Sequence, residues 1–336
     1  MALSPLLLGA TVLTILLLLG WLAMTIVSGS RPAREIAVSR DEADHVARVR
    51  RRGLVVDLVA VGAGIAVAVA VLSGVLDGLP GLDLGRGTLL ALGAGAFVGV
   101  LIICVGELTT PSPEGRVRHA GLARRSPSSF VGRGPAVVAG LGLATLAAVL
   151  TTGVLLASPD DMGREGRSIN IVCPLPDRAV VGSGHGPFPG SFYAVPIALG
   201  GVGLVLLTAV SLSAVARRPG LGVGSAPLDA ALRRGSATRI LGALGVAAWG
   251  TTVPIAAALA MGLWAMRRPI TYGIDGVEQS VACAPGAYGP LMWAAVAVAA
   301  VALVLALWSL AEVVTGGRRE LSDLTVTERT TAEVRW

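Results

Sequence analysis

Residues 289–314 read GPLMWAAVAVAAVALVLALWSLAEVV, and the one charged residue in this stretch, Glu312, comes only near its end. A helix needs roughly 20 consecutive apolar residues to cross a hydrocarbon core about 30 Å thick. The stretch therefore predicts a transmembrane helix. Similar stretches precede it at 5–28, 53–76, 88–108, 134–157, 193–216 and 239–266. We expect an all-α, polytopic membrane protein with seven transmembrane helices, arranged as one leading helix followed by three hairpins.

The composition of the whole chain agrees with this expectation. Of its 336 residues, 54% are hydrophobic and 14% are charged, and the mean hydropathy is +0.75. A soluble domain carries roughly 25% charged residues, so a soluble globular protein and a disordered one are both excluded. The seven spans form one predicted transmembrane domain over residues 1–316, and residues 317–336 form a short polar cytoplasmic tail.

The distribution of arginine predicts the orientation of the chain. The connectors after the first, third and fifth spans, together with the tail, hold 21 arginines, whereas the other connectors hold 6. Cytoplasmic connectors are enriched in Lys and Arg, so the side with 21 arginines is expected to be cytoplasmic. Seven spans then place the N-terminus outside and the C-terminus in the cytoplasm. We expect a multi-pass protein of the cell (plasma) membrane.

The chain contains no lysine, because all 27 of its basic side chains are arginines. A retinal protein needs a lysine for its Schiff base, and a G-x-x-x-x-G-K-[ST] loop needs one for its phosphates, so both classes are excluded. Codon bias in a high-GC bacterium explains the preference for arginine. The pI of about 10.2 then reflects membrane orientation, and no nucleic-acid partner is expected.

The arginine-rich connectors also contain helix signals. Ser39 and Glu42 have the spacing of a capping box, while Pro227 and Gly235 have the places of a first helical residue and a helix stop. We expect a short basic helix in each connector at the inner membrane surface, where it attracts anionic lipid headgroups. The alternative is a solvated loop whose arginines only set the orientation.

The cysteines predict a covalent link outside the cell. Cys173 lies in the external connector 158–192 and Cys283 in the external connector 267–288, and the external compartment permits disulfides. We predict a Cys173–Cys283 disulfide; the alternative is two free or lipid-modified thiols. Cys104, inside the third span, is expected to pack as a small apolar residue.

Three carboxylates fall within or at the edge of a span, all near its cytoplasmic end: Asp57, Glu107 and Glu312. A carboxylate in a membrane is by default a hypothesis for a functional site. At this shallow depth we expect interfacial ion pairs with headgroups or connector arginines, and a proton or cation site is the alternative. No carboxylate lies at mid-membrane, which argues against a proton- or sodium-coupled carrier with a central acidic site.

Hydroxyl groups offer the one hint of a transport path. The fourth and sixth spans each carry a threonine pair, and a proline follows the second pair: Thr151, Thr152, Thr251, Thr252 and Pro254. A helix kinked at this proline beside the hydroxyls could line a small polar cavity. The alternative is packing, in which each hydroxyl bonds to its own backbone or to a neighbouring helix.

Catalytic and cofactor groups are missing from the spans. The three histidines lie outside all seven spans and have no metal-ligand spacing, so we expect no haem, no metal and no other cofactor. We therefore expect a non-catalytic membrane protein, an accessory, scaffold or sensor subunit whose partners are membrane lipids and another membrane protein. The alternative is a carrier or permease for a small uncharged or apolar solute. A weaker third hypothesis is an enzyme acting on lipid with Glu107 and Glu312.

Overall fold

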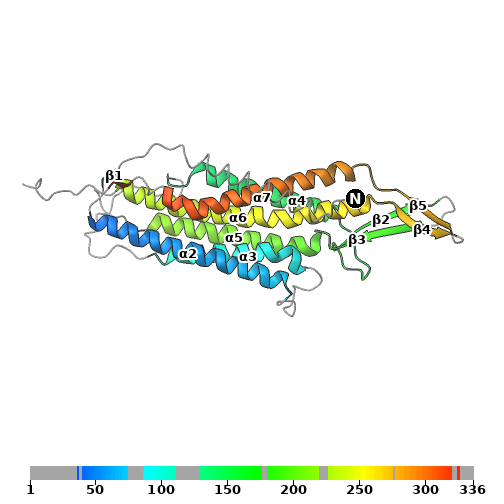
Figure 1. Cartoon of the computed structure of the whole chain (residues 1–336), viewed down its shortest axis with the longest axis horizontal. Helices are drawn as coiled ribbons and strands as arrows, with labels where there is room; N and C mark the ends of the chain where they lie inside the picture. The colour runs from blue at the N-terminus through cyan, green and yellow to red at the C-terminus, as the bar shows by residue number, and fades with distance from the viewer. Residues whose placement is uncertain are drawn as a thin grey trace, which may run out of the picture.

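The computed structural model describes residues 36–37, 40–74, 86–110, 129–175, 180–218, 226–274, 277–319 and 324–325. Most of this part is helical, and six long helices lie along one another as a bundle (Figure 1). They are α2 (Arg40–Leu72), α3 (Arg86–Leu108), α4 (Arg133–Leu156), α5 (Ser191–Arg217), α6 (Ala226–Met266) and α7 (Tyr288–Arg319).

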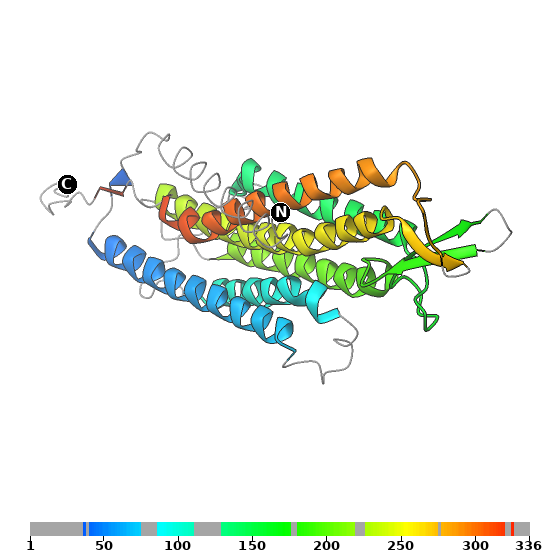
Figure 2. The same ribbon diagram turned by 45° about the vertical axis from the view of Figure 1, so that its right-hand side comes forward.

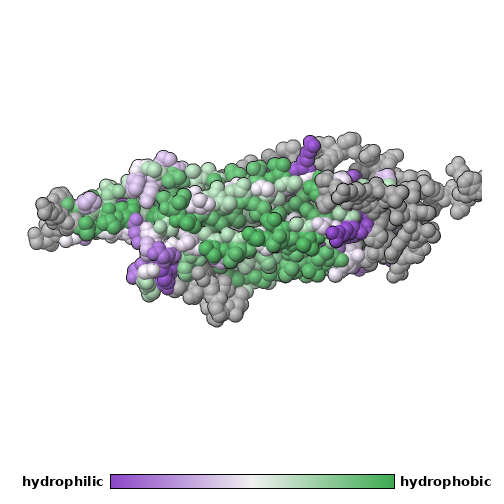
Figure 3. Space-filling model, turned by 180° about the vertical axis from the view of Figure 1, so that it is seen from behind, coloured by the Kyte–Doolittle hydropathy of each residue, from purple (hydrophilic) through white to green (hydrophobic). Residues whose placement is uncertain are grey.

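Each of the six helices is long and apolar enough to cross a membrane. On the face shown in Figure 3, apolar residues cover the middle of the bundle and hydrophilic residues gather near its ends. The chain therefore has the character of a multi-pass membrane protein. The count within the described residues is six, one fewer than the seven expected, and the predicted first span, 5–28, lies outside the described residues.

Helix α6 is the centre of the bundle. In its most apolar window 72% of the residues are buried, whereas the corresponding share is between 17% and 33% in the other five helices. It packs against α3, α4, α5 and α7, and α2 lies with α3 on one flank (Figure 2). Of the three expected hairpins, α2–α3 and α6–α7 pack closely, whereas α4 packs mainly against α6 and only weakly against α5.

Two of the helices extend well beyond the expected spans. The structure continues α2 back to Arg40 and α6 back to Ala226, so residues 40–52 and 226–238 of the first and third connectors belong to these long helices and not to separate surface helices. Gly235 does not stop the helix but lies buried inside α6. Prolines fall in the first turn of α4, α6 and α7, where the missing N–H has no intrahelical partner to lose. The second connector lies mostly outside the described residues.

The segments expected as external loops contain strands. Strands β2 (Ile169–Pro174) and β3 (Val180–His185) form one antiparallel hairpin, and β4 (Ile270–Ile274) and β5 (Val277–Val281) form another. The expected all-α class is therefore incomplete. Two further strands, β1 (Ile36–Ala37) and β6 (Leu324–Thr325), pair in parallel. We call the end of the bundle with β2–β5 the hairpin end, and the opposite end the arginine-rich end.

The base of the hairpins is fixed to the bundle by an apolar cluster. Ile169, Phe188, Tyr193 and Leu263 are fully buried there. Gly262 allows the close contact between α6 and Phe188, because a Cβ at this position would lie 2.5 Å from the Phe188 ring. The central helix and the first hairpin therefore share one core.

Candidate functional site

The arginine-rich end holds a group of buried charges, which we call the charge cluster. Its members come from three helices and from the residue after a fourth, and they are Asp57, Glu107, Arg218, Ser236 and Arg239. Arg239 of α6 lies at the centre, with one guanidinium nitrogen 2.6 Å from Asp57 Oδ1 and another 2.6 Å from Glu107 Oε1. Asp57 and Glu107 are each only 5% exposed. One arginine therefore joins α6 to both α2 and α3.

The other oxygen of the Glu107 carboxylate is also occupied. Glu107 Oε2 lies 2.7 Å from a guanidinium nitrogen of Arg218 and accepts a hydrogen bond of 2.8 Å from the Ser236 hydroxyl. Arg218 follows directly after α5 and also donates to the backbone carbonyl of Glu107. The contacts of Glu107 therefore bring the end of α5 into the same cluster.

A second buried arginine, Arg233, binds the carbonyls at the end of α5. Arg233 is 6% exposed and forms an ion pair of 2.9 Å with Asp229 on its own helix. Its guanidinium donates to the carbonyls of Val215 and Ala216, at 2.5 and 2.9 Å, and to that of Arg218 at 2.6 Å. The last carbonyls of a helix have no intrahelical donor, so Arg233 supplies the missing partners.

Positive and negative groups are equal in number in the charge cluster. Its two guanidinium groups face two carboxylates, and every carboxylate oxygen of Glu107 has a charged or hydroxyl partner. Gly53 makes room for Arg239, because a Cβ there would lie 3.0 Å from the guanidinium. Buried charges that are paired in this way hold a structure in one arrangement. The cluster can therefore fasten helices together.

The third predicted carboxylate does not belong to this group. Glu312 is half-buried on α7, and the residue that follows it, Val313, is buried in the core of the bundle. Sequence reasoning identified Asp57 and Glu107 but missed Arg218, Ser236 and Arg233. No local signal marks Arg218 or Ser236, because their contacts with Glu107 span more than 100 residues of sequence, whereas the spacing of Asp229 and Arg233 is a local signal that was overlooked.

Two cavities follow one another along the bundle, and both are lined by α2, α6 and α7. The outer one, of about 50 Å³, reaches the arginine-rich end, and Arg50, Asp57, Ser236, Arg239 and Val313 are among the residues that line it. The inner one is an apolar groove of about 290 Å³ formed by α2, α3, α6 and α7. We call them the polar pocket and the apolar groove.

The predicted threonine cavity is not formed by these spaces. Thr151, Thr152, Thr251 and Thr252 line neither the polar pocket nor the apolar groove. The hydroxyls of Thr152, Thr251 and Thr252 instead donate to carbonyls four residues earlier on their own helices, at 2.7 to 2.9 Å. Pro254 lies inside the uninterrupted helix α6.

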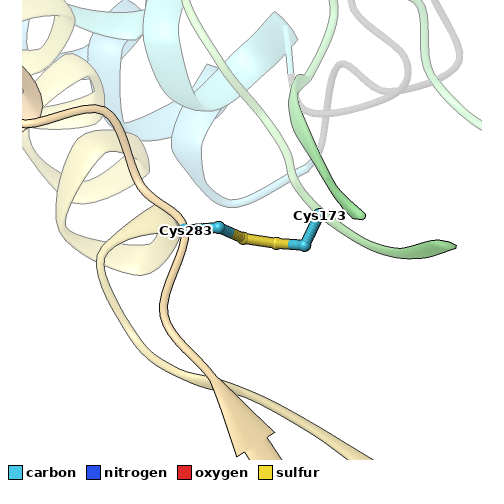
Figure 4. The surroundings of a disulfide bond; sticks show 2 residues. All are labelled: Cys173 and Cys283. Carbon is cyan, nitrogen blue, oxygen red and sulfur yellow. A yellow bond between two sulfur atoms is a disulfide. The ribbon is translucent and has the colours of Figure 1, made fainter. Parts of the chain in front are cut away.

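The hairpin end carries the predicted disulfide. Cys173 on β2 and Cys283, just after β5, are joined with 5.9 Å between their Cα atoms, and 110 residues separate them in sequence (Figure 4). The bond ties the two hairpins together, and we call the linked pair β2–β5 the crown. Cys104 is the one free cysteine in the described part of the chain, and it is buried.

A tight loop lies beneath the crown. Asp160 Oδ1 accepts hydrogen bonds from the backbone N–H groups of Met162 and Arg164, at 3.0 and 2.8 Å. Asp160 Oδ2 lies 2.8 Å from the guanidinium of Arg164 and 2.7 Å from that of Arg167. Burial by itself raises the pKa of Asp160, but these hydrogen bonds outweigh it and hold the pKa well below its ordinary value of 3.8. The carboxylate therefore stays ionised and organises the loop.

Comparisons with known proteins find no match. No protein-family model matches the chain, and neither a curated protein nor a solved structure matches it.

Proposed function

We propose that this chain is a non-catalytic multi-pass membrane protein that serves as an accessory, scaffold or sensor subunit of a membrane complex. The observation that carries the proposal is the crown, two hairpins that project past the end of the bundle as one disulfide-linked unit (Figure 1). Its base shares a core with the central helix α6. A rigid projection joined to the centre of a bundle is suited to holding another protein.

The surface of the crown supports a docking role. Val180 pairs with Pro174, two residues after Val172, so the two valines lie near the same end of the β2–β3 hairpin, and they are 66% and 68% exposed. A docked partner that covered both valines would remove their apolar area from water, which favours association. We therefore propose a second membrane protein as the partner that covers them.

The proposal includes the orientation and the seventh span. We propose that the predicted helix 5–28 crosses the membrane ahead of α2, so that the N-terminus lies outside. The positive-inside rule then puts the arginine-rich end in the cytoplasm and the crown outside the cell, where a disulfide persists. A plasma membrane of a high-GC bacterium remains the proposed location.

A pull-down in mild detergent tests the role. The tagged full chain should recover a membrane protein in stoichiometric amount, and the double variant Val172→Ser with Val180→Ser should recover at least fivefold less. Met162→Ser is the matched control, because Met162 is exposed at the same end but lies outside the crown. Recovery of no partner by the unaltered chain, or equal recovery by all three proteins, would refute the proposal.

A carrier for a small apolar solute is the second candidate, and the apolar groove is the observation that favours it. A carrier purified alone should move its solute across liposomes, whereas an accessory subunit should show no flux without its partner. The groove variant Gly250→Leu should then abolish flux, because this glycine lines the groove.

A further inference from the structure

We propose that the polar pocket and the apolar groove together bind one anionic glycerophospholipid, with its phosphate in the polar pocket and an acyl chain in the apolar groove. This inference does not depend on the accessory role proposed above. It concerns a bound lipid with a defined place between α2 and α7, in contrast to a general attraction of arginines to the membrane surface.

The apolar groove has the surface of a hydrocarbon binding site. Nearly all of its lining is apolar, and small residues on α2 and α3 keep it open, including Ala60, Gly64, Gly95 and Gly99. The glycines on α3 are also the places where α2 and α3 touch, because a Cβ on Gly99 would lie 3.3 Å from the Ala60 carbonyl. Leu310 and Val313 of α7 also line the groove. An acyl chain fits a groove with this lining.

The polar pocket has the charge of a phosphate site. Two guanidinium groups, from Arg50 and Arg239, and one carboxylate, from Asp57, line it, so the lining carries a net positive charge. The Ser236 hydroxyl also lies at the pocket. A volume of about 50 Å³ admits three or four groups the size of water, which suits the oxygens of a phosphate. Arg50 is exposed at the rim, where it can reach an arriving headgroup.

The two spaces follow one another along the same helices. Val313 of α7 lines both. On α2 the lining passes from Asp57 in the polar pocket to Ala60 in the groove, and on α6 it passes from Arg239 to Ala243. The order from the arginine-rich end inward is therefore charge first and hydrocarbon second, which is the order of head and tail in a phospholipid.

The charge argues for an anionic lipid in particular. Within the pocket Arg239 is already balanced by Asp57, at 2.6 Å, so Arg50 supplies the uncompensated charge among the lining residues. A zwitterionic headgroup brings its own ammonium group and gains less from such a site than phosphatidylglycerol does. We expect a single arginine near the surface to be worth about fivefold in affinity.

Native mass spectrometry of the full chain tests the assignment. The protein is purified in mild detergent and titrated with equal amounts of phosphatidylglycerol and phosphatidylcholine. We expect one retained phosphatidylglycerol per chain. Gly250→Leu should reduce retention at least tenfold, because a side chain there enters the groove, and Arg50→Gln should reduce the preference for phosphatidylglycerol about fivefold.

Matched variants control for folding and for general charge. A Cβ on Gly250 or on Gly200 would meet no atom within 4 Å, so neither substitution begins with a Cβ clash, but Gly200 lies on α5 and does not line the groove. Arg51 is exposed beside Arg50 and does not line the pocket. Gly200→Leu and Arg51→Gln should leave retention unchanged.

Three results would overturn the proposal. Equal retention of both lipids would remove the anionic headgroup from the assignment. An equal effect of Arg50→Gln and Arg51→Gln would show diffuse attraction without a defined pocket. Absence of any retained lipid on the unaltered chain would show that the groove holds something else, such as the predicted helix 5–28.

Discussion

Arg239 and Glu107 form an ion pair of 2.6 Å between α6 and α3, although 132 residues separate them in the sequence. The same guanidinium reaches Asp57 on α2, so three helices meet at one side chain. Asp57 and Glu107 are each only 5% exposed, so both of these ion pairs lie almost entirely within the bundle. The consequences of this contact can be measured.

Replacing the carboxylate of Glu107 should destabilise the bundle strongly. Glu107→Gln leaves Arg239 and Arg218 without a shared counter-charge in a buried place, and removal of one partner from a buried pair costs roughly 3–5 kcal/mol. We expect a clear fall in the midpoint of thermal unfolding in detergent. Glu165→Gln is the control, since Glu165 is exposed in the loop beneath the crown, and it should change the midpoint little.

A double-mutant cycle separates pairing from general damage. If Arg239 and Glu107 act as a pair, the losses from Arg239→Gln and Glu107→Gln should not add in the double variant. Additive losses would contradict a direct interaction.

The cysteines should behave as one bonded pair and one free thiol. Alkylation of the denatured, unreduced protein should modify one cysteine, Cys104, and alkylation after reduction should modify three. Replacing Cys173 and Cys283 by serine should lower stability by roughly 2–4 kcal/mol, because the bond constrains a long loop of the unfolded chain. Three modified cysteines without reduction would be incompatible with the bond.

Asp160 should make the loop beneath the crown sensitive to acid. Because its folded-state pKa is depressed, its contribution to stability is complete at pH 7. The contribution starts to fall below an unfolded-state pKa of about 3.9 and is lost as the pH drops through the folded-state value. Hydrogen-exchange protection of residues 158–168 should therefore differ between the native chain and Asp160→Asn at pH 7, and less at pH 3. The exposed neighbour provides the control, as Asp161→Asn should have little effect at either pH.

The buried threonines should tolerate the loss of their hydroxyls. Thr251 and Thr252 donate to the carbonyls of Ala247 and Ala248, which are also acceptors in the helix. Replacing both threonines by valine should change stability by less than about 1 kcal/mol. It should also leave any solute flux intact, whereas Gly250→Leu should block flux. Loss of flux in the valine variant would restore the predicted threonine path.

Reporter fusions test the proposed orientation. A reporter active only in the cytoplasm should be active after residue 336 and silent when placed between β4 and β5. A reporter active only outside should give the opposite pattern. Activity of the cytoplasmic reporter at the hairpin end would reverse the orientation, although the contacts within the bundle would be unaffected.

Much of the bundle could be predicted from apolar length alone. The expected spans 88–108, 134–157 and 193–216 agree with α3, α4 and α5 to within two residues at each end. The beginnings of α2 and α6 could not be predicted in this way, because a helix does not have to end where the hydrocarbon ends. Gly235 illustrates the difficulty, since it lies buried inside α6, next to Ser236 of the charge cluster.

The crown was missed although a signal for one hairpin was present. Asp275-Gly276 separates two runs of alternating residues, and such a dipeptide is a strong sign of a two-residue hairpin turn. The observed register pairs Ile274 with Val277, as that turn requires. The disulfide was predicted because both cysteines fall in external connectors. Its geometry was not, because it depends on how the two hairpins sit on the bundle.

The charge cluster also imposes an order on the assembly of the protein. A ribosome makes Asp57 and Glu107 before Arg218 and Arg239, so both carboxylates reach the bilayer while their counter-charges are still unmade. An unpaired carboxylate near the end of a span still carries a cost, so we expect α2 and α3 to settle fully only when their partners arrive. The arrival of α6, the fifth described helix, removes this cost and supplies the surface on which the others pack. We therefore expect insertion to be complete only when α6 arrives, because its Arg239 neutralises the carboxylates of α2 and α3.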